Sequence, residues 1–105
     1  MANDLEIIKR LEKEIGEELR IVGLEKISDF NISGAYAVDE ENRVIGLILG
    51  GKKLSKIPQT LLKLSHLNVL NLWNNKIVDI SPIKELRSLV IIKSAIYPFS
   101  KIYRI

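Results

Sequence analysis

Apolar residues recur at two different spacings along this chain of 105 residues, and each spacing predicts a different element. Residues 4 to about 16 carry apolar side chains three and four positions apart, which is the period of one face of an α-helix. This stripe consists of Leu5, Ile8, Leu11 and Ile15. Asn3 and Glu6 form a capping-box-like pair at the start, and Gly16 suits the end. We expect the helix to cover one end of the hydrophobic core.

Two short apolar segments in the middle of the chain predict a β-hairpin. Residues 36–38 and 43–49 are rich in aliphatic side chains and flank the polar residues 39–42. Between this hairpin and the helix, residues 17–35 carry apolar side chains without a clear period. We expect that part to be a loop with short extended pieces.

The stretch from Leu67 to Leu89 has the most regular pattern in the chain. It fits L-x-x-L-x-L-x-x-N-x-L, the signature of a repeat in which a short strand is followed by a turn. The matching residues are Leu67, Leu70, Leu72, Asn75 and Ile77. A related pattern begins 23 residues earlier at Val44, and a third begins 22 residues later at Leu89. Such a period predicts stacked coils whose strands lie side by side.

These residues resemble the leucine-rich repeats of the internalin type, which have 22 to 23 residues, and the helix and hairpin resemble the N-terminal cap of some of those proteins. The resemblance implies an α/β fold, a short leucine-rich-repeat solenoid with a parallel sheet and an N-terminal helix plus β-hairpin cap. The cap would span residues 1–43, and about two and a half coils would span residues 44–105. Both parts would form a single structural domain.

The resemblance also implies a role for one asparagine in each turn. Asn75 would point inward and bond backbone groups of the neighbouring coils, because a buried turn must pair its N–H and C=O groups. Lys52 holds the corresponding position of the first repeat. A lysine has no acceptor for backbone N–H groups, so we expect that turn to be solvated. The third repeat departs from the pattern after Ile92, and its strand would leave a bare edge unless a longer array continues it or the tail or a second copy covers it.

Leucine-rich repeats of this kind bind other proteins, so the resemblance implies a non-catalytic protein–protein interaction module. In each predicted strand, alternate side chains point away from the core onto the concave face. Ile48, Val69 and Ile91 are expected side by side there, with Trp73, the only tryptophan, toward one edge. The predicted partner-binding residues are Ile48, Val69, Asn71, Trp73, Asn74, Ile91 and Lys93.

Charge is divided unevenly along the chain, and this division leaves two alternative functions open. Residues 1–43 hold 11 acidic and 6 basic residues, whereas residues 44–105 hold 2 and 10. Such halves attract each other, so the chain would be able to self-assemble as a homodimer or a head-to-tail array through the edge of the third strand. Alternatively, the basic repeats would bind nucleic acid or an anionic surface. We do not expect nucleic acid, because no aromatic side chains alternate with the basic ones.

The sequence offers little for catalysis or for metal binding. It has no cysteine, and its one histidine, His66, lies in a predicted loop. Asp79 and Glu85 are the only acids after residue 43, and we expect Asp79 to bond nearby backbone N–H groups. We therefore expect no enzyme activity, no cofactor and no metal. The polar N-terminus and the lack of an apolar run near ~20 residues predict a cytoplasmic protein without a membrane span.

Overall fold

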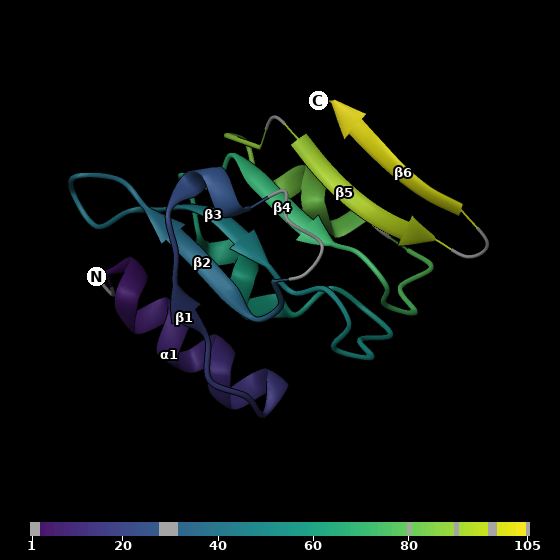
Figure 1. The fold of residues 1–105 in the computed structure, drawn as a ribbon, viewed down its shortest axis with the longest axis horizontal. Helices are drawn as coiled ribbons and strands as arrows, with labels where there is room; N and C mark the ends of the chain where they lie inside the picture. Colours follow the sequence, from purple (N-terminus) through teal and green to yellow (C-terminus); the bar gives the residue numbers. More distant parts are fainter. Residues whose placement is uncertain (1–2, 28–31, 80, 90, 97–98, 105) are drawn as a thin grey trace.

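A computed structural model describes residues 3–27, 32–79, 81–89, 91–96 and 99–104, the last two ranges by their backbone. The described residues form a mixed α/β fold with one α-helix, three short 3₁₀ helices and one sheet (Figure 1). The elements are α1 (Asp4–Ile15), β1 (Arg20–Ile21), η1 (Leu24–Lys26), β2 (Ala35–Val38), β3 (Val44–Ile48), η2 (Gln59–Lys63), β4 (Val69–Leu72), η3 (Ser81–Glu85), β5 (Ile91–Ile96) and β6 (Phe99–Arg104).

The six strands lie in the sheet in their order along the chain. β3, β4 and β5 are parallel, whereas β2–β3 and β5–β6 are antiparallel pairs, so the predicted hairpin is confirmed. Leu47 pairs with Leu70, and Leu70 pairs with Ile92, which is the alignment that the repeat spacing predicts. Of the alternatives for the edge of the third strand, the structure has the tail covering it, because β6 pairs along β5.

The helix α1 begins and ends as the sequence predicts. The side-chain oxygen of Asn3 accepts a hydrogen bond from the backbone N–H of Glu6 at 2.9 Å, and Gly16 takes the left-handed conformation that ends the helix. The predicted apolar stripe is rotated slightly, since Leu5 is 36% exposed. The buried face consists of Ile7, Ile8 and Leu11.

The main core lies on the side of the sheet that α1 and η2 cover, and it contains Leu47, Leu70 and residues of both helices. Two carboxylates of α1 tie the helix to the rest of the chain. Asp4 accepts a hydrogen bond from the backbone N–H of Val44 at 2.8 Å, and Glu14 accepts one from Thr60 at 3.1 Å. The helix therefore shares one core with the strands.

Asn75 points inward and joins two successive turns of the chain. Its Oδ1 atom accepts hydrogen bonds from the backbone N–H groups of Lys52 at 3.0 Å and Leu54 at 3.1 Å. Its Nδ2 atom donates to the carbonyl groups of Leu49 at 2.7 Å and Leu72 at 3.1 Å. The predicted role of Asn75 is confirmed. The expectation of a solvated turn at Lys52 is wrong, because Asn75 supplies the acceptor that lysine lacks.

The side chain of Lys52 reaches back to the N-terminal part of the chain. Its ammonium group forms an ion pair with Glu17, and the side chain is 14% exposed. It passes over Gly34, where the Cβ of any other residue would lie 3.0 Å from the Nζ atom. This ion pair holds the turn after β3 against the segment that follows α1.

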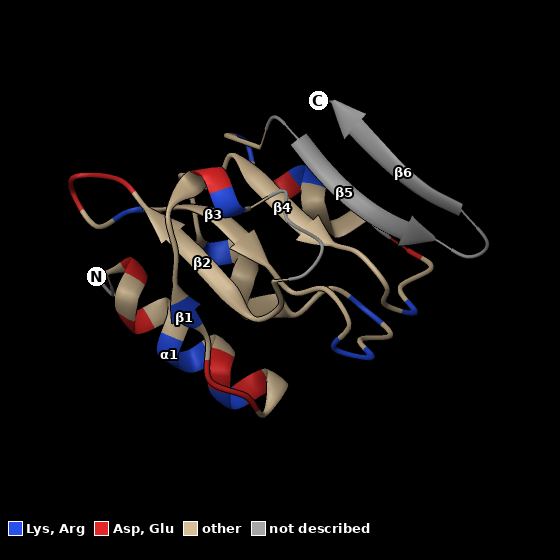
Figure 2. Ribbon diagram, in the orientation of Figure 1, with Lys and Arg blue, Asp and Glu red and all other residues tan. Residues whose placement is uncertain are grey.

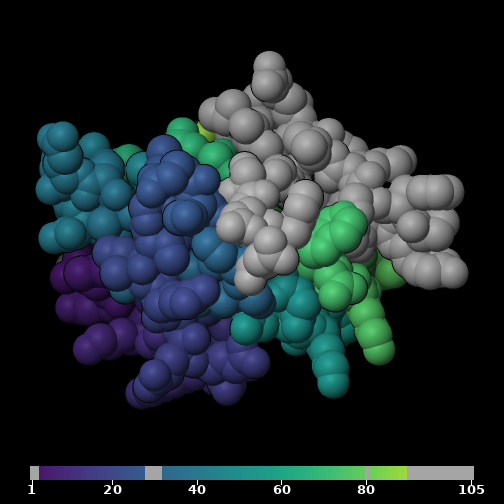
Figure 3. All heavy atoms as spheres, viewed as in Figure 1, coloured from purple at the N-terminus to yellow at the C-terminus, as the bar shows by residue number. Residues whose placement is uncertain are grey.

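The opposite side of the sheet is partly covered by residues 22–27 and 32–33, which we call the covering segment. Ile27 is 2% exposed and packs with Ala35, Ala37 and Ile48 in a second, smaller cluster. Gly46 makes this approach possible, because a Cβ there would lie 2.8 Å from Cγ1 of Ile27. Figure 3 shows atoms of residues 22–27 lying in front of the strands.

Candidate functional site

A hollow of about 290 Å³ opens where the carboxyl ends of β3 and β4 lie side by side, and we call it the Trp73 hollow. Four of the seven predicted partner-binding residues contribute to it. Its lining consists of Ile32, Ser33, Ile48, Gly50, Gly51, Asn71, Trp73 and Asn74. Ile32 and Ser33 come from the segment without a sequence period, so the repeat pattern did not reveal them.

The backbone around Trp73 is held close to the two glycines that follow β3. The N–H of Gly51 donates to the carbonyl oxygen of Trp73 at 2.8 Å. A Cβ at Gly50 would lie 3.1 Å from that same oxygen, so a larger residue would push the two turns apart. The hydroxyl of Ser33 donates to the carbonyl of Gly50. These contacts fix the wall of the hollow, and the side chain of Trp73 is half-buried in it.

Asn71 was predicted to be open on this face, but its side chain is 1% exposed. Its Nδ2 atom donates to the carbonyl of Ile27 at 3.2 Å, and its Oδ1 atom accepts from the backbone N–H of Trp73 at 3.0 Å. A buried amide must have such partners. Asn71 therefore holds the covering segment and the end of β4 in place. Ile48 is also 1% exposed, contrary to the prediction, because Ile27 covers it.

The predicted row of Ile48, Val69 and Ile91 is wrong at its first member. Val69 pairs with Gly46, and Ile48 pairs with Asn71. The hydrogen-bond register pairs residues that are 23 positions apart. Ile48 therefore lies two residues beyond the position opposite Val69. Val69 is half-buried and packs against the cluster around Ile27, so it does not line the Trp73 hollow.

The remaining predicted residues lie at the margin of this site. Asn74 is exposed and has a left-handed backbone with φ of 58°, so its amide stands at the rim. The backbones of Ile91 and Lys93 pair with Val69 and Asn71 in the next strand. The side chains of Ile91 and Lys93 lie outside the described part of the structure.

A second group of polar residues lies at the turn between β2 and β3. The Oδ2 atom of Asp39 pairs with Nε of Arg43 at 2.7 Å. Its Oδ1 atom accepts from the backbone N–H groups of Glu41 at 2.9 Å and Arg43 at 3.0 Å. Desolvation raises the pKa of Asp39, but these hydrogen bonds outweigh it and leave the pKa below its ordinary value of 3.8. The carboxylate thus stabilises the turn.

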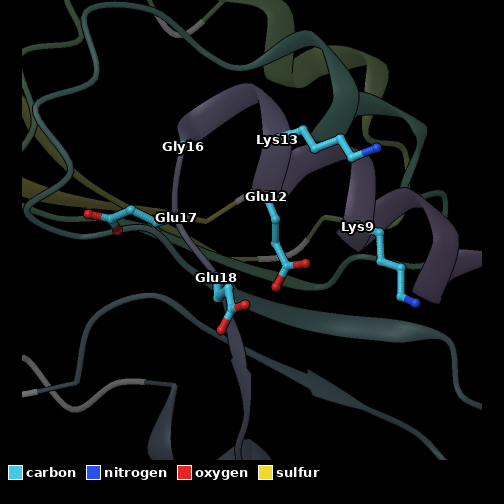
Figure 4. Close-up of a pocket in the computed structure, with 6 residues that line it drawn as sticks. All are labelled: Lys9, Glu12, Lys13, Gly16, Glu17 and Glu18. Atoms are coloured by element: carbon cyan, nitrogen blue, oxygen red, sulfur yellow. The ribbon is translucent and has the colours of Figure 1, made fainter.

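A hollow of about 400 Å³ lies at the C-terminal end of α1, and two of its acids have structural partners. It is lined by Lys9, Glu12, Lys13, Gly16, Glu17 and Glu18. Glu12 accepts a hydrogen bond from the backbone N–H of Leu19 at 2.7 Å, and Glu17 pairs with Lys52. Figure 4 shows that the side chains of Glu17 and Glu18 point in different directions from the chain after Gly16. This hollow therefore gathers acids without directing them at one point.

His66 and Asp79 lie away from the Trp73 hollow. His66 is exposed, and its Nδ1 atom lies 3.3 Å from the hydroxyl of the adjacent Ser65. Asp79 accepts from the backbone N–H of Ser81 at 2.9 Å, as predicted, and bonds to the hydroxyl and the N–H of Ser81 lower its pKa. Among the residues that the structure describes, no three His, Asp or Glu side chains converge to hold a metal ion.

Comparison with the models of known protein families and with curated proteins gave no match to this chain. The helical part of the described structure is short, and none of these helices has the length and apolar character needed to cross a membrane.

Proposed function

We propose that this chain is a short leucine-rich-repeat solenoid that binds a protein partner through the Trp73 hollow, without catalysing a reaction. The repeat interpretation is supported by the parallel pairing of β3, β4 and β5 at the spacing of the sequence pattern. It is also supported by the hydrogen bonds of Asn75 to two successive turns. Stacked coils of this kind present one broad face of a sheet to a partner.

The main support for the proposed binding site is the half-buried side chain of Trp73 beside Gly50 and Gly51. Tryptophan is strongly enriched among the residues that contribute most to protein–protein binding, and such residues lie in desolvated pockets. The hollow, at about 290 Å³, is small enough to take one or two side chains of a partner rather than a whole element. The exposed amide of Asn74 offers both a donor and an acceptor at the rim.

The other predicted residues take different parts in this proposal. Ile48 and Asn71 form the floor of the hollow and fix its shape, because both are buried. Ile91 and Lys93 occupy the next strand and are proposed to extend the surface on that side. A partner would therefore meet Trp73 and Asn74 first.

Replacement of Trp73 tests this function. We expect Trp73→Ala to weaken partner binding, measured as capture from cell extract, by about thirtyfold or more, since losing an interface anchor costs about 2 kcal/mol or more. Leu5→Ala is the matched control, because Leu5 is a partly exposed apolar residue on α1. Thermal unfolding is measured on both variants. Equal capture by Trp73→Ala and wild type would contradict the proposal, and a large loss of melting temperature would place Trp73 in the core.

A further inference from the structure

A second hollow, of about 600 Å³, lies on the other side of the covering segment, and we call it the acidic hollow. Its floor is apolar: Leu24 is 49% exposed, and Val38 and Ile45 are half-buried. Its rim has three acids and one arginine, which leaves it negative. The lining residues are Leu24, Val38, Asp39, Glu40, Glu41, Arg43 and Ile45. Arg43 forms ion pairs with Asp39 and Glu41, and the side chain of Glu40 is exposed to solvent.

The loops after β3 and β4 carry the opposite combination, and we call them the basic end. Val78 is 81% exposed, which is the highest exposure of any large apolar side chain among the described residues. Lys76 and Lys53 are exposed nearby, since the backbone N–H of Lys76 donates to the carbonyl of Leu54 at 2.8 Å and joins the two loops. The one acid in this part, Asp79, is bonded to Ser81. The basic end is thus an apolar protrusion flanked by lysines.

The two surfaces lie too far apart to meet within one molecule. Figure 2 shows the acidic turn at one end of the long axis and the lysine-bearing loops toward the other end. The molecule extends 37 Å along this axis. One surface has an apolar hollow with a negative rim, and the other has an apolar protrusion with positive flanks. Contact between the exposed Val78 and the exposed Leu24 would remove apolar surface from water, which is favourable in free energy. The charges around the two residues are complementary.

We propose that the basic end of one copy of this chain docks into the acidic hollow of a second copy. The contact is heterologous, because each copy uses two different surfaces, so every copy added leaves one of each surface free. Head-to-tail chains follow rather than a closed dimer. The basic end adjoins the Trp73 hollow on the same two loops, but Val78, Lys53 and Lys76 do not line that hollow. The edge of β6 is not needed for this contact.

A contact between two loops and one shallow hollow buries little area, so the association is expected to be weak. Sedimentation velocity from about 10 μM to about 1 mM protein covers the range in which such contacts form. We expect the sedimentation coefficient of the wild-type chain to rise with concentration. The rise should shrink at about 1 M salt, where charges are screened beyond ~3 Å. A wild-type chain that sediments as one monomeric species throughout this range would overturn the proposal.

Two single substitutions test the direction of the contact. Leu24→Lys puts a positive charge in the hollow, and Val78→Asp puts a negative charge on the protrusion; both positions are exposed, which limits the effect on folding. We expect each variant alone to stay monomeric. Their equimolar mixture should associate again, since the intact protrusion of the Leu24→Lys chain can enter the intact hollow of the Val78→Asp chain. Continued association of Val78→Asp alone, or a purely monomeric mixture, contradicts the proposal.

A charge-reversal pair repeats the test on exposed polar residues, whose substitution leaves the core untouched. Glu40→Lys and Lys76→Glu should each weaken association by about tenfold, and mixing the two should restore it because the reversed charges again attract. Lys63→Glu is the matched control, since Lys63 is exposed on η2 outside both surfaces. If Lys63→Glu weakens association as much as Lys76→Glu, net charge rather than this contact controls it, and the proposal fails.

Discussion

The side chain of Asn75 bonds the backbone of Lys52, 23 residues earlier, with 3.0 Å between Oδ1 and the amide nitrogen. The same oxygen accepts a second hydrogen bond from the backbone N–H of Leu54. The Nδ2 atom donates to the backbone carbonyl groups of Leu49 and Leu72. One buried side chain thus pairs backbone groups of two turns that have no strand to pair with. These hydrogen bonds link the two turns to each other, as backbone hydrogen bonds link the neighbouring strands.

Asn75→Ala is predicted to destabilise the fold strongly. The substitution leaves several buried N–H and C=O groups without partners, and each such group costs about 1–3 kcal/mol. We expect a loss of about 2–4 kcal/mol in the free energy of unfolding, measured by urea denaturation. Asn74→Gly is the control, because Asn74 is exposed on the same turn and glycine adopts its left-handed backbone freely, so stability should change by less than about 0.5 kcal/mol. Equal effects at the two positions would show that the bonds of Asn75 contribute little.

Gly46→Val is predicted to displace the segment that covers the sheet. Its Cβ would lie 2.8 Å from Ile27, and overpacking of this kind costs about 1–3 kcal/mol. Ile27→Ala makes room for the new side chain but loses its own burial. We expect the double variant to be less destabilised than the sum of the two single variants, as measured by thermal unfolding. Simple additivity would mean that the two side chains do not meet.

Asp39 is predicted to make stability depend on pH in the acid range. Its pKa is lower in the folded chain than its ordinary value of 3.8, so its contribution is present above that value and is lost as the pH falls below it. Asp39→Asn should therefore flatten the fall in melting temperature between about pH 5 and about pH 2. Asp79→Asn should also reduce the loss of melting temperature at acid pH, independently of Asp39, because hydrogen bonds from Ser81 lower the pKa of Asp79. An Asp39→Asn profile that parallels the wild type would contradict this assignment.

The periodic parts of the chain could be predicted from the sequence because local patterns determine them. The cap of α1 at Asn3, the hairpin of β2 and β3 and the inward turn of Asn75 all follow from residue types at fixed spacings. The pairing of Leu47 with Leu70 follows from the repeat length alone. Each of these features depends on residues that are close in sequence or one period apart.

The covering segment could not be predicted because its contacts have no period. Ile27 packs against three small residues of the sheet, Ala35, Ala37 and Gly46. Nothing in the repeat pattern indicates that these positions form a depression for one isoleucine. For this reason Ile48 and Asn71 were expected on an open face, although they lie beneath that segment. The sequence did not decide whether the tail covers the third strand, as β6 does, because the third repeat lacks the leucine pattern.

The most direct test of the proposed binding site is an NMR titration of the isotope-labelled chain with the purified partner. Trp73 is the only tryptophan, so its indole N–H gives one assigned signal from the hollow itself. The account predicts that this signal and the backbone amides of Gly51 and Asn74 shift or broaden first as partner is added. Shifts confined to other parts of the chain, with the indole signal unchanged at saturation, would contradict it.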